Sequence, residues 1–181
     1  MSRSDERTDA GDYRPGAAGD AQVERAGERW VLVFVRTLKH SPERVWRALT
    51  DPAELSEWAS FDPDRDLGSP GRVTLTMAGG DGQEKAAGSV LRAEPPTLLE
   101  YRWGDDVLRW ELEPAGTGTR LILRHQVSGP EWLSKVAAGW HICIDVADAF
   151  MSGAPVGRIV ADDAMKHGWE RLNEEYAARF R

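Results

Sequence analysis

The clearest hydrophobic pattern in the chain is an alternation of apolar and polar residues between Gly71 and Val127. Turn signals at AGGDGQ, AEPPT, WGDD and EPAGTGT divide this stretch. A period of two is typical of strands with one buried face, so the pattern predicts an antiparallel meander of about five strands. The apolar face carries Leu99, Tyr101, Trp103, Leu108, Trp110, Leu112, Leu121, Leu123, His125 and Val127. The opposite face carries Glu100, Arg102, Arg109, Glu111, Arg120 and Arg124.

A further strand and two short helices are predicted before the meander. The segment RWVLVFVRTL from Arg29 is rich in β-branched and aromatic residues, which favours a strand. Ser41 and Pro42 then form an N-cap and first turn, and Val45, Trp46 and Leu49 follow at helical spacing. Asp51 caps a second short helix that carries Leu55 and Trp58.

Two helices are predicted after the meander. Pro130 opens a long helix that reaches Met151 and presents one apolar stripe, long enough to cross the sheet. A last helix from about Asp162 to Phe180 also carries an apolar stripe and should pack on the domain. The class is therefore α+β, with a curved antiparallel sheet of about six strands wrapped on a long helix, an order typical of the helix-grip fold.

The chain is expected to form one globular unit with additions at each end. Residues 1–28 are rich in charge, Gly and Ala and lack apolar periodicity, which predicts a disordered tail. Residues 29–153 hold the predicted domain, and residues 154–181 form a helical extension packed on it.

Composition narrows the expected partners. A formal net charge of −7 argues against nucleic acid and against an anionic membrane surface as partners. A single cysteine, Cys143, cannot form an internal disulfide, and no apolar stretch has the layout of a membrane span or a signal peptide. We therefore expect a cytoplasmic protein.

Aromatic residues dominate the predicted interior. Six of the eight tryptophans lie on apolar stripes, which is typical either of a packed core or of an aromatic pocket. The residues expected to contact an apolar small molecule are Trp46, Trp58, Tyr101, Trp103, Trp110, His125, Trp140 and Ile144.

Few side chains offer chemistry. His125 lies on an apolar strand face, where it would serve either as a polar anchor or proton carrier, or as a hydrogen-bonded structural residue. His141 and Asp145 are interpreted as a surface pair on the long helix, and Asp105 and Asp106 as turn residues. The histidines are scattered, so we predict no metal, no cofactor and no catalytic residues; Cys143 is expected to be structural.

Several motifs carry a family resemblance. The stretches SPERVWRALTDPAELSEW, PPTLLEYRW, LRWELEP, GTRLILRH and AAGWHICIDVADAF resemble the SRPBCC superfamily, and within it the family of the activator of heat-shock protein 90 ATPase. The resemblance implies a helix-grip fold with a cavity between sheet and helix. Ala59 departs from relatives that often carry a further aromatic at this point, and no counterpart of the eukaryotic activator's separate N-terminal domain is expected in residues 1–28.

Three functions remain open at this stage. The first is a binding protein whose cavity holds an apolar or aromatic small molecule between sheet and helix. The second is an enzyme of the polyketide cyclase or dehydratase kind in which His125 moves protons, although the sequence offers no acid partner for it. The third is a module that contacts a chaperone through the charged sheet face. A homodimer is one alternative for the oligomeric state.

Overall fold

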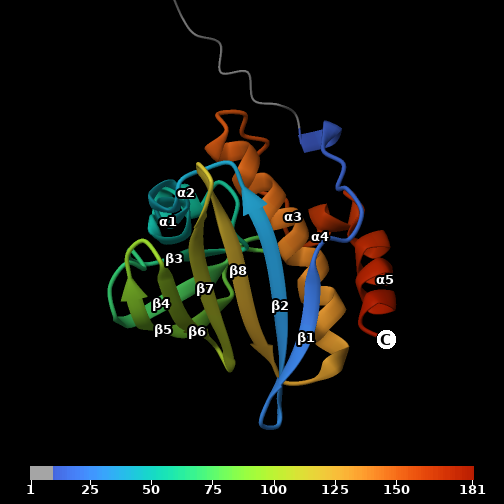
Figure 1. The fold of residues 1–181 in the computed structure, drawn as a ribbon, viewed down its shortest axis with the longest axis horizontal. Helices are drawn as coiled ribbons and strands as arrows, with labels where there is room; N and C mark the ends of the chain where they lie inside the picture. The colour runs from blue at the N-terminus through green and yellow to red at the C-terminus, as the bar shows by residue number, and fades with distance from the viewer. Residues whose placement is uncertain (1–9) are drawn as a thin grey trace, which may run out of the picture.

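The computed structural model describes residues 10–181, which form a curled antiparallel sheet around a long helix (Figure 1). The sheet has eight strands in the order β1-β2-β8-β7-β6-β5-β4-β3. Its strands are β1 (Ala21–Ala26), β2 (Arg29–Leu38), β3 (Phe61–Pro63), β4 (Gly71–Met77), β5 (Lys85–Glu94), β6 (Leu98–Trp103), β7 (Asp106–Ala115) and β8 (Gly118–Val127). The predicted class and helix-grip architecture are confirmed, with two strands more than expected.

The helices all lie on one side of the sheet or at its ends. They are α1 (Pro42–Thr50), α2 (Pro52–Leu55), α3 (Leu133–Met151), α4 (Asp162–Met165) and α5 (Trp169–Arg179), with short 3-10 turns at Ala10–Asp12 and Pro130–Trp132. Ser41 caps α1 by accepting a hydrogen bond from the Arg44 backbone N–H at 3.2 Å, as the sequence predicts. None of the helices within residues 10–181 has the length and apolar character that crossing a membrane requires.

The two sheet faces follow the predicted alternation. Trp110 pairs with Leu99 on β6 and with Leu123 on β8, and all three are at most 1% exposed. The Trp110 and Trp140 ring centroids lie 5.2 Å apart, which places α3 against this inner face as expected. The core therefore lies between α3 and the concave side of the sheet.

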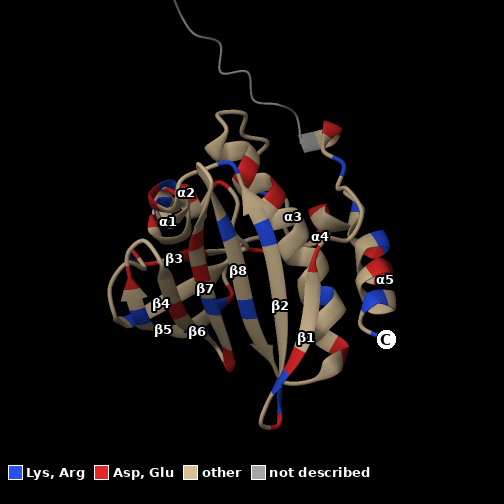
Figure 2. Cartoon of the chain, viewed as in Figure 1, with Lys and Arg blue, Asp and Glu red and all other residues tan. Residues whose placement is uncertain are grey.

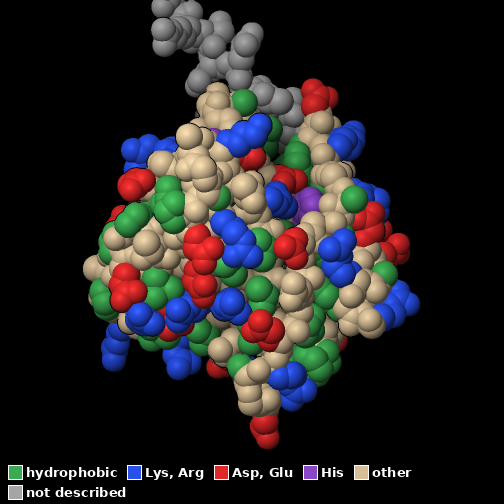
Figure 3. Space-filling view, in the orientation of Figure 1, with side chains coloured by type: hydrophobic (Ala, Val, Ile, Leu, Met, Phe, Trp, Pro, Cys, Tyr) green, Lys and Arg blue, Asp and Glu red, His purple; other side chains and the backbone are tan. Residues whose placement is uncertain are grey.

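The outer face is charged but internally paired. Arg124 contacts both Glu24 and Glu111, and Arg109 contacts both Glu111 and Glu100. In Figure 2, β7 carries both acidic and basic residues and the neighbouring β8 carries basic ones, and Figure 3 shows the two charges intermixed rather than gathered in one patch. This face balances its own charge.

The prediction of a disordered tail over residues 1–28 is wrong for residues 10–28, the part that the structure describes. Residues 1–9 lie outside the described residues, but β1 pairs with β2 along its whole length, with Val23 opposite Leu32. The Gly19 N–H donates to the Tyr176 hydroxyl at 3.0 Å, and Tyr13 donates to Asp145. A polar edge strand is stabilised by backbone hydrogen bonds, which apolar periodicity does not report.

The last predicted helix is divided. Gly168, with φ at +86°, separates α4 from α5 and turns the chain between them. A left-handed backbone is readily adopted by glycine and interrupts a helix. Leu172 and Tyr176 of α5 are fully buried against α3 and the sheet, so this extension packs on the rest of the fold.

Candidate ligand-binding site

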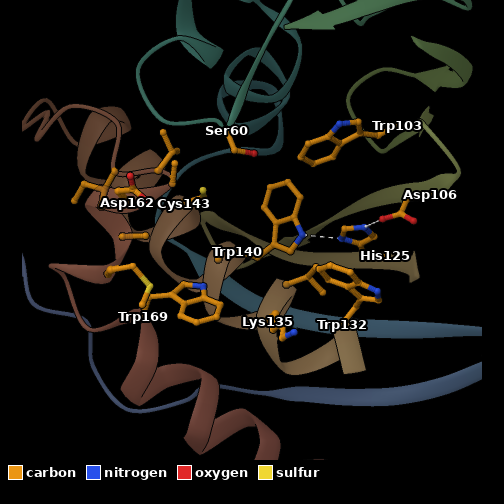
Figure 4. A pocket seen from close by; sticks show the side chains of 17 residues that line it. Ser60, Trp103, Asp106, His125, Trp132, Lys135, Trp140, Cys143, Asp162 and Trp169 are labelled. Carbon is orange, nitrogen blue, oxygen red and sulfur yellow. Dashed lines mark hydrogen bonds and ion pairs between the residues drawn. The ribbon is translucent and has the colours of Figure 1, made fainter. Parts of the chain in front are cut away.

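A cavity of about 580 Å³ opens between α3, the ends of the central strands and the segment that follows α3 (Figure 4). We name residues 152–161, which connect α3 to α4, the strap. The strap supplies Ile159, Val160 and Ala161 to one wall, and α3 supplies Val136, Gly139 and Cys143 to another. The volume falls within the range of about 300–1,000 Å³ that is typical of small-molecule sites.

Four of the eight tryptophans line this cavity. They come from separate elements: Trp103 from the end of β6, Trp132 from the turn before α3, Trp140 from α3 and Trp169 from the start of α5. Figure 4 shows Trp140 in the centre with Trp103 and His125 beside it and Trp169 on the far side. The walls are therefore mostly aromatic and apolar.

A hydrogen-bonded chain crosses one end of the cavity. The Trp140 indole N–H donates to Nδ1 of His125 at 2.9 Å, and Nε2 of His125 lies 2.8 Å from a carboxylate oxygen of Asp106. Because indole nitrogen can only donate, Nδ1 must be the acceptor and Nε2 must carry the proton that it donates to Asp106. The chain fixes both the tautomer and the orientation of the imidazole.

The surroundings of His125 bear on both interpretations of this residue. The side chain is only 4% exposed, and both ring nitrogens already have partners. A proton carrier needs a nitrogen that can reach the reacting group. In this arrangement His125 links Trp140 to Asp106, and both of its ring nitrogens are engaged within the protein.

Asp106 corrects two expectations. The sequence placed it only in a hairpin turn and indicated no acid partner for His125, whereas the structure brings the two together and places Asp106 on the cavity wall. Arg29 lies 3.6 Å from the other carboxylate oxygen. The partnership links the start of β7 to the last residues of β8, at the end of this strand pair far from its connecting turn, a contact that turn composition cannot reveal.

Cys143 also lines the cavity, but as an unreactive group. Burial raises the pKa of its thiol to about 12, because the thiolate would lose its hydration. Since the thiolate is the nucleophilic form, the thiol acts here as a small apolar wall residue. The structural role predicted for Cys143 fits this environment.

The strap is held from both sides. Arg158 forms two hydrogen bonds to the carboxylate of Asp62, at 2.8 and 2.9 Å, and a third to the Leu55 carbonyl at 3.1 Å. Ala161 has φ at +51°, unusual for a residue with a Cβ, and a Cβ on Gly79 would lie 2.7 Å from the Ala161 Cβ. Glycine at position 79 therefore lets the β4–β5 loop approach the strap.

The cavity contains only part of the predicted set. Trp103, His125 and Trp140 line it. Trp58, Tyr101, Trp110 and Ile144 are instead buried in the packed core, and Trp46 is half-buried on α1 away from the cavity. Their polar atoms are paired inside the core: Trp110 donates to the Tyr101 hydroxyl at 3.2 Å and Trp58 to the Ala48 carbonyl at 3.0 Å. Burial raises the pKa of Tyr101 above its ordinary value, so the phenol stays neutral.

Most of the remaining wall was not predicted. Trp132, Lys135, Asp162, Met165 and Trp169 reach the cavity from segments whose apolar pattern indicated only helix packing. Trp169 lies on the apolar stripe of the predicted last helix. The sequence therefore indicates that this side chain faces the domain, but not that it lines a cavity.

His141 is also corrected. The expected surface pair is a buried histidine whose Nδ1 lies 2.8 Å from the Tyr176 hydroxyl and whose Nε2 lies 3.5 Å from Asp145. Desolvation lowers the pKa of His141, and the nearby Asp145 carboxylate offsets part of that effect. The physical reason is that α5 and residues 13–19 cover this side of α3.

No cluster of three or more metal-ligating side chains occurs within residues 10–181. The polar side chains of the cavity, such as Asp106, Lys135 and Asp162, are dispersed among its indoles.

Comparison with known proteins places this architecture in a family. The family model for activator of Hsp90 ATPase homolog 1-like proteins matches residues 39–178, and the chain belongs to this family. A search of curated proteins gives no match.

Solved structures share the fold. CalU16 from Micromonospora echinospora superposes with a TM-score of 0.65 at 23% identity, covering 88% of this chain and 96% of its own. A Rhodobacter sphaeroides protein gives 0.58 at 25% identity, covering 72% of this chain and 97% of its own. DynU16, a protein of the dynemicin biosynthetic locus, gives 0.61 at 19% identity, covering 73% of this chain and 50% of its own.

Proposed function

We propose that this protein binds an apolar or aromatic small molecule in the cavity between α3, the strap and the strand ends. The observation that carries the proposal is the wall itself: four indoles surround about 580 Å³ of space that the protein's own side chains leave open. If these indoles belonged to a packed core, neighbouring side chains would fill the space between them, because protein interiors pack to nearly crystalline density.

The polar groups of the cavity favour binding over catalysis. The Trp140–His125–Asp106 chain occupies both imidazole nitrogens, and the Cys143 thiol is held neutral. A cyclase or dehydratase would need an accessible group to move protons. The partly exposed carboxylate of Asp106 is itself tied to His125 and Arg29, so this chain of hydrogen bonds supports a preorganised wall better than a free acid–base pair.

The charged sheet face gives little support to a chaperone-binding module. Three of its arginines, Arg109, Arg120 and Arg124, are paired with glutamates of the sheet, as in the contacts of Arg124 with Glu24 and Glu111. Docking there would have to replace existing ion pairs rather than satisfy free charges. The match to DynU16, from a biosynthetic locus, is consistent with a role near small-molecule chemistry.

Gly139 makes a direct test of the cavity available. It lies on α3 in the cavity wall, and a Cβ added there would meet nothing within 4 Å. We expect the Gly139→Leu side chain to project into the space that the neutral probe N-phenylnaphthylamine would occupy and so to abolish the fluorescence enhancement of this probe. Gly139→Ala is the matched control, since it also removes glycine from the helix but adds only one methyl group.

The proposal requires wild type and Gly139→Ala to bind the probe while Gly139→Leu, with an unchanged circular dichroism spectrum, does not. Equal probe binding by Gly139→Leu, or no binding by wild type, would contradict it. Native mass spectrometry of protein purified from its own host would then identify a retained molecule by its mass.

A further inference from the structure

Three rings at the polar end of the cavity form a narrow slot. The Trp103 and His125 rings are nearly parallel, 21° apart, with their centroids separated by 6.5 Å. Trp140 stands close to perpendicular to both, at 74° to Trp103 and 68° to His125, with centroids 6.4 and 6.1 Å away. Figure 4 shows Trp103 and His125 as two walls, with Trp140 closing one side.

The spacing of the two walls is close to that of an aromatic sandwich. A flat ring in contact with both faces needs about 3.5 Å on each side, so the walls must stand roughly 7 Å apart. The centroid separation of 6.5 Å is an upper bound on the gap between the two ring planes, so the walls must part by at least about half an ångström to admit a flat ring. A saturated ring is thicker and would force the walls considerably further apart.

The side chains that form the two walls differ in how firmly the protein holds them. His125 is held by Trp140 and Asp106 and is almost fully buried. Trp103 is half-buried at the end of β6 and precedes Gly104, which has φ at +58° in the hairpin turn. The small opening that a flat ring requires can therefore come from Trp103 while the imidazole stays fixed.

We propose that the ligand of this cavity is a planar aromatic molecule that inserts one ring between Trp103 and His125. This deepens the proposed function and rests on it. The remaining volume of the cavity, lined by Val136, Ile159 and Trp169, takes the rest of the molecule.

The polar group beside the slot adds a second feature to the ligand. The Asp106 carboxylate lies on the cavity wall and is one-third exposed; one of its oxygens bonds to His125 and the other lies 3.6 Å from Arg29. A carboxylate can only accept hydrogen bonds and offers about four lone-pair sites on its two oxygens. The inserted ring therefore carries a donor, such as a phenolic hydroxyl, directed at Asp106.

Calorimetric titration with three bicyclic probes tests the proposal. β-Naphthol is planar with a donor, decahydro-β-naphthol keeps the carbon skeleton and the hydroxyl but is saturated, and β-methoxynaphthalene is planar without the donor. Stacking on two faces should make β-naphthol bind roughly tenfold more tightly than the saturated alcohol. We also expect it to bind more tightly than the methoxy compound.

Two variants locate the preference. Trp103→Leu keeps an apolar wall but removes the flat face, so the preference for β-naphthol over its saturated analogue should disappear. Trp46→Leu is the matched control, since Trp46 is half-buried outside the cavity, and should keep the preference. Proton NMR of bound β-naphthol adds a readout independent of any variant, because a ring held between two aromatic faces has its resonances shifted upfield.

The outcomes separate the two proposals. If the saturated alcohol binds as tightly as β-naphthol, or if bound naphthol shows no upfield shift, the slot is wrong while the cavity function stands. If the methoxy compound binds as tightly as β-naphthol, the assignment of Asp106 is wrong. If the wild-type protein binds none of the three bicyclic probes and does not bind N-phenylnaphthylamine, the proposed cavity function itself is wrong.

Discussion

The space between α3 and the sheet has two halves, and tryptophans are prominent in both. In one half they form a packed core, and in the other they line an open cavity. In the half near α1, Trp58 and Trp110 meet edge to face at 6.4 Å and are at most 2% exposed. The cavity left there measures only about 10 Å³. In the other half, Trp103 and Trp169 are half-buried around about 580 Å³ of open space.

The difference comes from what covers each half. Helix α1 lies against the first half and fills it with Val45, Ala48 and Leu49. The second half is covered by the strap, α4 and the start of α5, and the strap and α4 include small or exposed residues such as Ala161 and Met165. Trp140 stands on the boundary and contacts Trp110 on one side and Trp103 on the other. Whether an inward-facing indole belongs to the packed core or to the cavity wall therefore depends on which segment packs over it.

The largest expected effect contrasts one tryptophan from each half. Trp110→Ala should lower the free energy of unfolding by about 3–5 kcal/mol, because it leaves a cavity in a packed core and strands the Tyr101 hydroxyl. Trp132→Ala should cost less than about 0.5 kcal/mol, since this indole is 47% exposed. Urea denaturation measures both, and similar losses would remove the distinction between the halves.

A smaller effect is expected at the strap. Arg158→Ala removes three hydrogen bonds to Asp62 and Leu55, and we expect a loss of about 1–2 kcal/mol, because the pair is partly exposed. Amide exchange should accelerate in residues 154–161 and stay unchanged around Trp110. Arg158→Lys, which keeps the charge but not the paired geometry, serves as the control, and faster exchange throughout the core would argue against a locally held strap.

These two contrasts also show what could be predicted from the sequence. The strand phasing that buries Leu99, Trp110 and Leu123 follows from a period of two, which is a local property. The division between core and cavity depends on what the strap covers, and the strap has no periodicity to reveal its path. The Asp106–His125 contact joins residues 19 positions apart at the open end of the β7–β8 pair, and the composition of the turn around Asp106 does not indicate it.

The N-terminal region gives the same lesson in reverse. Polar composition predicted disorder for the N-terminal residues, which instead form β1 and help to cover His141. The prediction that His141 and Asp145 form a surface pair was wrong for the same reason. Composition measures how much apolar area a segment can bury, but not the backbone pairing that an existing sheet edge offers it.

A gain in stability of about 0.5–1 kcal/mol is expected from Gly139→Ala, because alanine loses less backbone entropy in a helix interior and its methyl meets no neighbour. Thermal unfolding would detect it as a rise in Tm. A fall in Tm would mean that the space beside Gly139 is filled, and the open half would then resemble the packed one.

The smallest effect at neutral pH concerns His141. Its pKa is lowered in the folded protein, first by desolvation, so the neutral form is favoured in the native state. In the unfolded chain the imidazole takes up a proton near the ordinary histidine pKa of about 6.5, while the native state resists protonation. The stability that is present above that pH therefore falls as the pH drops below it. His141→Gln should lose this part of the acid-side decline in urea unfolding at several pH values. An unchanged decline would show that His141 is not the group involved.

The most direct test of the account follows all eight indole N–H resonances by NMR during titration with N-phenylnaphthylamine. Assignment by single Trp→Phe variants distinguishes the two halves of the interior. The account predicts large shifts for Trp103, Trp132, Trp140 and Trp169, and none for Trp58, whose indole is bonded to Ala48 inside the packed half. Shifts centred on Trp58 and Trp110, or no shift at saturating probe, would contradict the assignment of the open half as the binding site.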